Sequence, residues 1–322
     1  MAGFAVRLFG KFHLEHDKQV VRSLEGCKAQ ELFYYLLLNR QRQHPRETLA
    51  TLLWGYCTTT QSKKYLRQAL WQIQVALGSE IDANCEAGSG DQYGDDGRLL
   101  QVDPEWVSVN AKAGMWLDVE VFEQAHALAH GIPGQELDGP VLQAIQQAVS
   151  LYTGDLLEGC YHDWCLFERE RLQNVYLGML DKLISYSLAT RDYEAGLDYG
   201  ECILRYNRAR ERTHREMMRL RYLAGDRTAA LQQYGSCVAI LRDELSAIPA
   251  HSTVELYEQI LADDLPELVS THQPVVAQSY AAVETPLSAL LDHLQQLSTN
   301  LGEVQQQIKH DLNAIRAVLR RH

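Results

Sequence analysis

The 322-residue chain is acidic overall, with 30 lysines and arginines against 42 aspartates and glutamates and a net charge of −12. Its 46% apolar and 22% charged residues are ordinary for a globular protein, and its length leaves room for two or three domains. No apolar run approaches the roughly 18 residues of a membrane span. The N-terminus also lacks the basic-then-apolar pattern of a signal peptide, so we expect a cytoplasmic protein with no membrane association.

The charge is unevenly distributed along the sequence. Residues 1–80 carry 11 basic against 6 acidic side chains, whereas residues 113–265 carry 13 against 24. The distribution of charge along the chain locates a nucleic-acid-binding face better than the total net charge does. This distribution favours the N-terminal part as the place of such a face. The seven cysteines form no CxxC pair, which predicts reduced and mostly buried thiols without a metal.

The first elements are predicted to be strands followed by helices. Alternating apolar and polar residues over 4–22 indicate a small antiparallel meander. The apolar spacing becomes helical over residues 28–39. A second helix is expected to open at His44-Pro45, with Pro45 in its first turn. Its inner side is predicted to consist of Leu49, Leu52 and Leu53.

The third helix, residues 60–77, has the most informative pattern. One side is apolar and comprises Tyr65, Leu66, Ala69, Leu70, Ile73, Ala76 and Leu77. The other side holds cations and amides but no acid, and comprises Thr60, Lys63, Lys64, Arg67, Gln68, Trp71 and Gln74. Such a face suits a helix in the DNA major groove, where Arg and Lys bond to guanine and Gln bonds to adenine. The alternative is an ordinary solvated face of an amphipathic helix.

A hairpin is predicted to close the N-terminal domain. Residues 78–98 have the Gly-, Asp- and Ser-rich composition of a loop, without the acid spacing of a calcium site. Two short strands follow at 98–102 and 106–109, joined by a turn at 103–105. Strands, three helices and a hairpin are the order of a winged helix-turn-helix, which we place at residues 1–112.

The middle of the chain, residues 113–265, is predicted to be a tetratricopeptide-like helical repeat domain, so the fold as a whole is mainly α. The segment Asp192–Leu197 recurs as Asp226–Leu231 after 34 residues, the tetratricopeptide period. Helices stacked in this way present a concave surface to protein partners. Arginines crowd residues 205–221, and they indicate either an anion site or ion pairs with neighbouring acids.

The C-terminal part is predicted to be a linker at 266–286 and a coiled-coil dimerisation helix at 287–322. Apolar residues there are spaced alternately three and four apart, with one offset. They are Leu287, Leu290, Leu294, Leu297, Leu301, Val304, Ile308, Leu312, Ile315 and Leu319. An isolated helix would be marginal, so a homodimer is expected, with packing onto the helical domain as the alternative.

Several motifs in order resemble the SARP-type bacterial transcriptional activators. In the first domain these are Leu8–Gly10 with Phe12, Lys28–Leu32, Tyr35–Leu38, Pro45–Leu49, Leu53–Gly55, Leu66–Trp71, and Leu117-Asp118 with Phe122. In the second they are Tyr152–Gly159, Trp164–Leu172, Arg210–Arg219, Leu223–Leu231 and Gln233-Tyr234. The resemblance covers roughly residues 4–262. It implies a response-regulator-type winged helix, a bacterial transcriptional activator domain and contact with RNA polymerase.

The functional prediction is a sequence-specific, dimeric activator that binds double-stranded DNA. It is not an enzyme and needs no cofactor, because no phosphate loop, dinucleotide fingerprint or hydrolase motif occurs. His126 and His130 share a helix face, but no third metal ligand is apparent. The predicted DNA contacts are Lys63, Lys64, Arg67 and Gln68 in the groove, Thr60, Arg42 and Arg46 at phosphates, and Arg98 in the wing. The alternatives are a helical-repeat interaction adaptor and a small-anion sensor.

Overall fold

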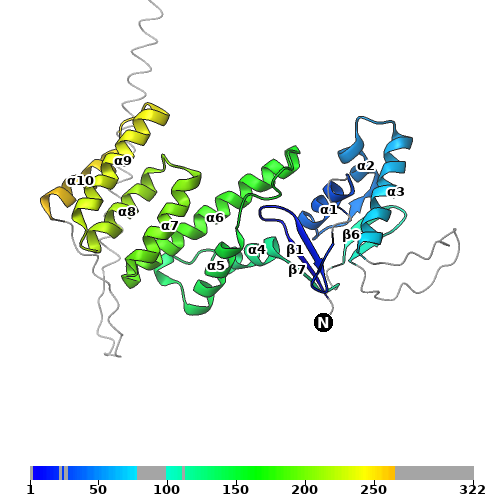
Figure 1. The fold of residues 1–322 in the computed structure, drawn as a ribbon, viewed down its shortest axis with the longest axis horizontal. Coiled ribbons are helices and arrows are strands. Elements are labelled where there is room, and N and C mark those ends of the chain that lie inside the picture. The colour runs from blue at the N-terminus through cyan, green and yellow to red at the C-terminus, as the bar shows by residue number, and fades with distance from the viewer. Residues whose placement is uncertain (1–2, 22–23, 25–27, 78–98, 111–112, 265–322) are drawn as a thin grey trace, which may run out of the picture. The chain divides into compact units, whose positions relative to one another are not determined.

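The N-terminal strands form a sheet that a later strand completes. The computed structural model describes residues 3–21, 24, 28–77, 99–110 and 113–264 (Figure 1). The predicted meander is present as β1 (Phe4–Arg7), β2 (His13–His16) and β3 (Gln19–Val20). The sheet order is β3-β2-β1-β7, and β7 (Met115–Leu117) pairs parallel to β1. The sequence pattern did not predict β7.

Three helices and a second sheet complete the winged helix that the sequence predicts. The helices are α1 (Lys28–Leu38), α2 (Arg46–Trp54) and α3 (Thr59–Ala76). The second sheet has the order β4-β6-β5 and consists of β4 (His44–Pro45), β5 (Leu100–Val102) and β6 (Trp106–Val109). Both strands of the predicted hairpin are therefore present.

Two details of the second helix differ from the prediction. His44-Pro45 does not open α2 but forms β4, whose residues pair with Val107 and Trp106. Pro45 then serves as the N-cap, with a ψ of 133°. Leu52 is 41% exposed and is not part of the inner side, which consists of buried Leu49 and Leu53. Pairing with the distant hairpin therefore overrides the local preference of Pro for a first helical turn.

A buried carboxylate joins the first sheet to the helices that follow. Asp118, the first residue of α4 (Asp118–Leu128), accepts hydrogen bonds from the backbone N–H groups of Leu8 at 2.7 Å and Phe9 at 2.9 Å. Its other oxygen accepts the Val119 N–H at 2.7 Å. Burial raises the pKa of this carboxyl group, and the three hydrogen bonds oppose that shift. One apolar core runs from the N-terminal sheet through α4 and into α7.

The remaining helices stack in sequence, as the repeat predicts. They are α5 (Gly139–Leu151), α6 (Asp163–Thr190), α7 (Tyr193–Tyr206), α8 (Glu211–Leu223), α9 (Arg227–Leu245) and α10 (His251–Ala262), with a short 3₁₀ turn, η1 (Gly134–Glu136), before α5. From α6 to α10 each helix packs on the next (Figure 1). Asp192 and Asp226, the first residues of the two repeated segments, both cap helices by accepting a backbone N–H three residues on.

Close packing of these helices depends on a glycine, which gives a testable prediction. A Cβ atom at Gly196 would lie 2.9 Å from Leu220 Cδ2 and 3.1 Å from Ser187 Cβ. Gly196→Ala should therefore lower the free energy of unfolding by about 1–3 kcal/mol through overpacking. Gly178, inside α6, has no neighbouring atom within 4 Å of such a Cβ. Gly178→Ala should instead stabilise by about 0.5–1 kcal/mol. Chemical denaturation of both variants measures the difference, and shifts of the same sign would show that α7 and α8 are not packed this closely.

Within the described residues, no helix is both long enough and apolar enough to cross a bilayer. The predicted linker and coiled coil, residues 266–322, lie outside the described residues, and so does Arg98.

Candidate nucleic-acid interface

Helix α3 has the two-sided character that the sequence predicts. Thr58 begins the helix with a capping box, in which its hydroxyl accepts the Gln61 N–H and the Gln61 side chain accepts the Thr58 N–H. The inward side is buried and includes Leu66, Ala69, Leu70 and Ile73. The opposite side is exposed at Thr60, Lys63, Lys64, Arg67, Gln68 and Trp71. One apolar stripe thus fixes the helix and turns its cations and amides to solvent.

The cations on this outer face are not equivalent. Lys63 Nζ lies 2.7 Å from the Glu47 carboxylate of α2, and this contact lowers the pKa of Glu47. In the part of the chain that the structure describes, no hydrogen bond or ion pair engages the side chains of Lys64, Arg67 or Gln68. The surface is therefore not free of acid, because a neighbouring helix supplies a carboxylate. Lys64, Arg67 and Gln68 remain available for a ligand.

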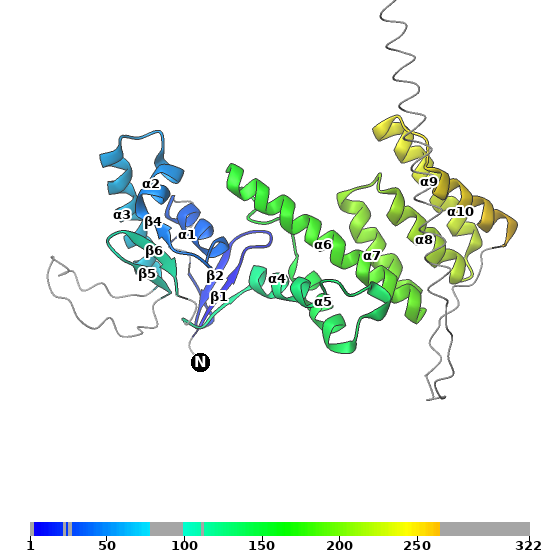
Figure 2. The ribbon, with the colours of Figure 1, turned by 180° about the vertical axis from the view of Figure 1, so that it is seen from behind.

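A groove lies between α3, the start of α2 and the turn of the β5–β6 hairpin. Figure 2 shows that hairpin beside α3. The groove has a volume of about 870 Å³, and its lining residues include Arg46, Thr48, Arg67 and Glu105. Arg46 donates to the Asp103 carbonyl oxygen at 3.0 Å. Burial, together with the charge of the nearby Arg67 guanidinium, lowers the pKa of Arg46. An anion in the groove would relieve this repulsion between two cations.

The two other predicted phosphate contacts, Arg42 and the start of α2, differ in how far their donors are already hydrogen-bonded. Arg42 is exposed, and its guanidinium donates to Tyr35 Oη and Asn39 Oδ1, both at 3.2 Å. At the start of α2, the Arg46 N–H already donates to the Glu105 carbonyl oxygen at 2.9 Å, so this amide is not available for a phosphate. No side chain caps the helix there, which leaves the next amides of the first turn for an anion.

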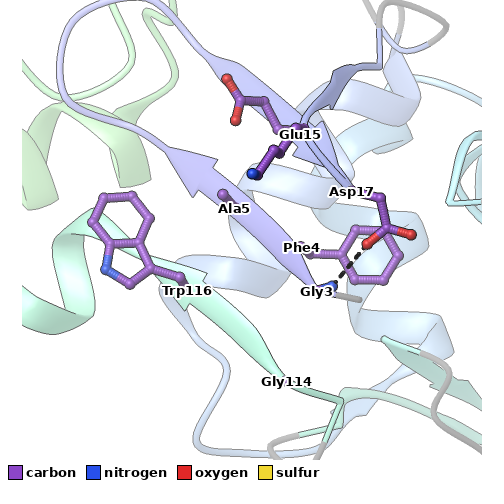
Figure 3. Close-up of a pocket in the computed structure, with 8 residues that line it drawn as sticks. Gly3, Phe4, Ala5, Glu15, Asp17, Gly114 and Trp116 are labelled. Atoms are coloured by element: carbon purple, nitrogen blue, oxygen red, sulfur yellow. Dashed lines mark hydrogen bonds between the residues drawn. The ribbon is translucent and has the colours of Figure 1, made fainter. Parts of the chain in front are cut away.

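A second pocket lies at the edge of the N-terminal sheet, and it tests the small-anion alternative. Figure 3 shows Glu15, Asp17 and Trp116 among its lining residues. The Asp17 carboxylate accepts the Gly3 N–H at 3.1 Å. This pocket of about 560 Å³ is lined by two carboxylates and one lysine, Lys18, a net negative lining that does not favour an anion, whereas Arg46, Lys63 and Arg67 outnumber the two carboxylates of the groove at α3.

Five of the seven arginines in segment 205–221 contact internal partners, namely Arg208, Arg210, Arg212, Arg215 and Arg219. Arg210 makes a two-pronged contact with Asp181, at 2.8 and 2.9 Å. Arg208 lies 3.4 Å from Glu244, and Arg219 lies 3.0 Å from Glu216. Arg215 donates to the Thr253 hydroxyl at 2.9 Å. Of the two interpretations left open by the sequence, the structure favours internal pairing.

His126 lies in the last turn of α4, whereas His130 lies in the turn just beyond the helix end. The rings of His126 and His130 are 6.4 Å apart and nearly perpendicular. Among the described residues, no group of three or more His, Cys, Asp or Glu side chains is arranged to hold a metal ion.

Comparison with known proteins identifies one domain of the chain and supports the fold. The chain is similar to the structure of Mycobacterium tuberculosis EmbR in complex with a low-affinity phosphopeptide, with a TM-score of 0.57 and 18% identity. The match covers 82% of this chain and 66% of the EmbR chain, so the chain spans just under two thirds of EmbR's length. This likeness concerns the fold. No curated protein sequence matches the chain. A family model, the bacterial transcriptional activator domain, matches residues 117–261. This is the activator domain that the sequence resemblance implies, and it covers a little less than half of the chain.

Two residues that shape the candidate interface were not predicted from the sequence. Glu47 holds Lys63, and Thr48 lines the groove beside Arg46. Both lie in the first turn of α2, directly after Pro45. Their position on the helix was predictable, but their contact with α3 depends on how the two helices pack.

Proposed function

We propose that this chain is a SARP-type transcriptional activator that binds duplex DNA by placing the outer face of α3 in the major groove. The observation that carries the proposal is the exposed set of Lys64, Arg67 and Gln68, which have no partner among the described residues and are held on a helix that is buried on its other side. Arg and Lys bond to the guanine edge and Gln to the adenine edge, so these residue types suit base recognition.

Phosphate contacts are proposed around this helix. The two guanidinium groups of Arg46 and Arg67 repel one another in the groove, which favours an anion there. Thr60 in the first turn of α3 and Arg42 beside α1 are exposed and are proposed to contact the flanking phosphates. Lys63 would reach a phosphate only by leaving Glu47. Arg98 stays a sequence prediction for the wing.

The helical repeats are proposed to serve activation. The family resemblance implies contact with RNA polymerase, and stacked helical repeats present a surface suited to protein segments. EmbR is known in complex with a phosphopeptide. We do not extend that ligand to this chain, because four arginines of segment 205–221 already contact Asp181, Glu216, Glu244 and Thr253.

Selection from a random duplex pool tests the proposal. The full chain, immobilised at low salt, should enrich one sequence motif, and a dimer should enrich two related half-sites at a fixed spacing. A parallel selection with Lys64→Ala/Arg67→Ala serves as the control and should lose the motif. If the wild-type chain enriches no motif over several rounds, the proposal of sequence-specific recognition is wrong.

Dimerisation through the C-terminal heptads is a separate proposal that rests on the sequence. The leucine and isoleucine seam at 287–319 would be exposed in a monomer, and a second copy would bury it. Truncation after Glu284 should convert the protein from a dimer to a monomer in light scattering. A dimeric mass after truncation would locate the dimer contact within residues 1–284.

The rival function is an interaction adaptor whose winged helix contacts protein. The overall net charge of −12 favours it. The local surface of α3 favours DNA, because its unpaired side chains are basic or amide-bearing. The adaptor predicts that neither duplex affinity nor its salt dependence responds to changes on α3.

A further inference from the structure

Glu47 places a carboxylate within a surface that is otherwise rich in cations. It lies in the first turn of α2, and its side chain is 79% exposed. Its carboxylate accepts a hydrogen bond from Lys63 Nζ of α3 at 2.7 Å, so the contact bridges the two helices. Glu47 and Lys63 together line both the groove at α3 and a second hollow of about 260 Å³ at the start of that helix. The pair therefore belongs to the proposed DNA-binding surface.

The contact between Glu47 and Lys63 contributes little to folding. The Lys63 side chain is 50% exposed, and the Glu47 side chain is more exposed still, so water screens both charges. A negative charge does favour the N-terminus of α2, as it does in the first turn of any helix. That preference requires the carboxylate but not its contact with α3. The contact therefore matters mainly for the charge that α3 presents to a ligand.

Pairing with Glu47 cancels the charge that Lys63 would otherwise offer to DNA. Each DNA phosphate carries one negative charge, as the carboxylate does. Moving Lys63 from Glu47 to a phosphate exchanges one ion pair for another and leaves Glu47 unpaired beside the DNA backbone, where like charges repel. Lys64 and Arg67 have no acidic partner among the described residues, so no such exchange reduces their contribution.

We propose that Glu47 limits the sequence-independent part of DNA binding by keeping Lys63 paired. This inference rests on the proposed function, because it concerns the same surface. Contacts with phosphates supply nearly all of the affinity for DNA of unrelated sequence, whereas contacts with base edges distinguish one sequence from another. By withholding one cation from phosphates, Glu47 lowers binding to unrelated DNA and leaves Lys64, Arg67 and Gln68 available for base edges.

Binding of the full chain to a labelled duplex of random sequence tests the proposal by fluorescence anisotropy. Glu47→Gln keeps the size of the side chain and removes its charge, which frees Lys63 for a phosphate. The affinity for the random duplex should rise by about 3- to 10-fold at roughly 0.1 M salt, because one more phosphate is neutralised. The slope of log affinity against log salt concentration should become steeper by about 0.9.

Two further variants assign the effect to the pair. Glu47→Gln/Lys63→Gln removes both charges, so its salt slope should return to the wild-type value. Glu194→Gln removes an exposed carboxylate from the first turn of α7, and so matches Glu47→Gln in net charge and in helix position. Its affinity should stay within about twofold of wild type, because salt screens exposed charges that lie far from the duplex. Thermal denaturation verifies that each variant is folded.

The possible results separate this inference from the proposed function. If wild type and Glu47→Gln bind the random duplex with the same affinity and slope, the inference is wrong although DNA binding stands. A steeper slope that persists in the double variant, or an equal gain in Glu194→Gln, would also overturn it, because the gain would not come from Lys63. If none of these proteins binds duplex DNA at low salt, the proposed function fails and this inference fails with it.

Discussion

Replacing Lys64 and Arg67 together with alanine is expected to weaken binding of the selected duplex by about 30- to 1,000-fold. Each side chain is exposed on α3, and neither has a hydrogen bond or ion-pair partner within the described residues. Each well-placed contact to a base edge contributes about 1–3 kcal/mol, and a contribution of about 1–2 kcal/mol from each of the two residues gives this range. Fluorescence anisotropy with a labelled duplex measures the change.

A charge-matched variant controls for the loss of two positive charges. Arg208→Ala/Arg242→Ala removes the same charge from exposed positions on the helical repeats, where each arginine lies in a surface ion pair. Surface pairs of this kind contribute little to stability, so the control should fold and bind DNA within about twofold of wild type. If both variants weakened DNA binding equally, binding would depend on the overall charge of the protein. The proposal that α3 forms the interface would then be wrong.

Asp118→Ala is expected to destabilise the protein by about 2–5 kcal/mol. The substitution leaves the buried N–H groups of Leu8 and Phe9 without their acceptor, and each unsatisfied buried donor costs about 1–3 kcal/mol. Burial raises the pKa of Asp118, so keeping this carboxylate charged inside the protein itself costs free energy. The substitution removes that cost. The net destabilisation should therefore be smaller than the summed cost of the lost hydrogen bonds. Urea denaturation measures the loss.

Two further variants make the result interpretable. Asp118→Asn keeps one carbonyl oxygen that can accept from Leu8 and Phe9, so it should fall between Asp118→Ala and wild type and remain folded. Glu136→Ala removes an exposed carboxylate from η1 and should change stability by about 0.5 kcal/mol or less. In Asp118→Asn, amide hydrogen exchange should accelerate at Leu8 and Phe9. Unchanged exchange there would show that Asp118 does not hold the sheet to α4.

Elements set by short-range sequence were predictable. The amphipathic division of α3 follows from its 3.6-residue period, and the repeated helices begin at Asp192 and Asp226, whose side chains cap the backbone directly after them. These features depend on residues within one or two helical turns. The family resemblance added the activator domain, which the match over residues 117–261 bears out.

Features that depend on distant contacts were not predictable. The three residues of β7 carry no periodic signal, and their strand exists because they pair with β1 more than 100 residues earlier. Pro45 has the residue type of a helix start, but pairing of β4 with β6 moves the helix boundary to Arg46. Both outcomes are decided by tertiary pairing rather than by local preference.

The candidate site also has features that the sequence predicts and features that depend on tertiary packing. Exposure of Lys64, Arg67 and Gln68 followed from the helical pattern. The pairing of Lys63 with Glu47 did not, because the carboxylate comes from another helix. Sequence therefore identified the exposed face of α3, and packing selected which of its cations remain available.

The salt dependence of duplex binding tests the central claim most directly. Each phosphate neutralised by a basic side chain contributes about −0.9 to the slope of log affinity against log salt concentration. With Arg42, Arg46, Lys64 and Arg67 near the duplex, we predict a slope of about −3 to −4 for the wild type, shallower by about 1–2 in Lys64→Ala/Arg67→Ala. A slope near zero, or the same slope in both proteins, would contradict DNA binding through α3.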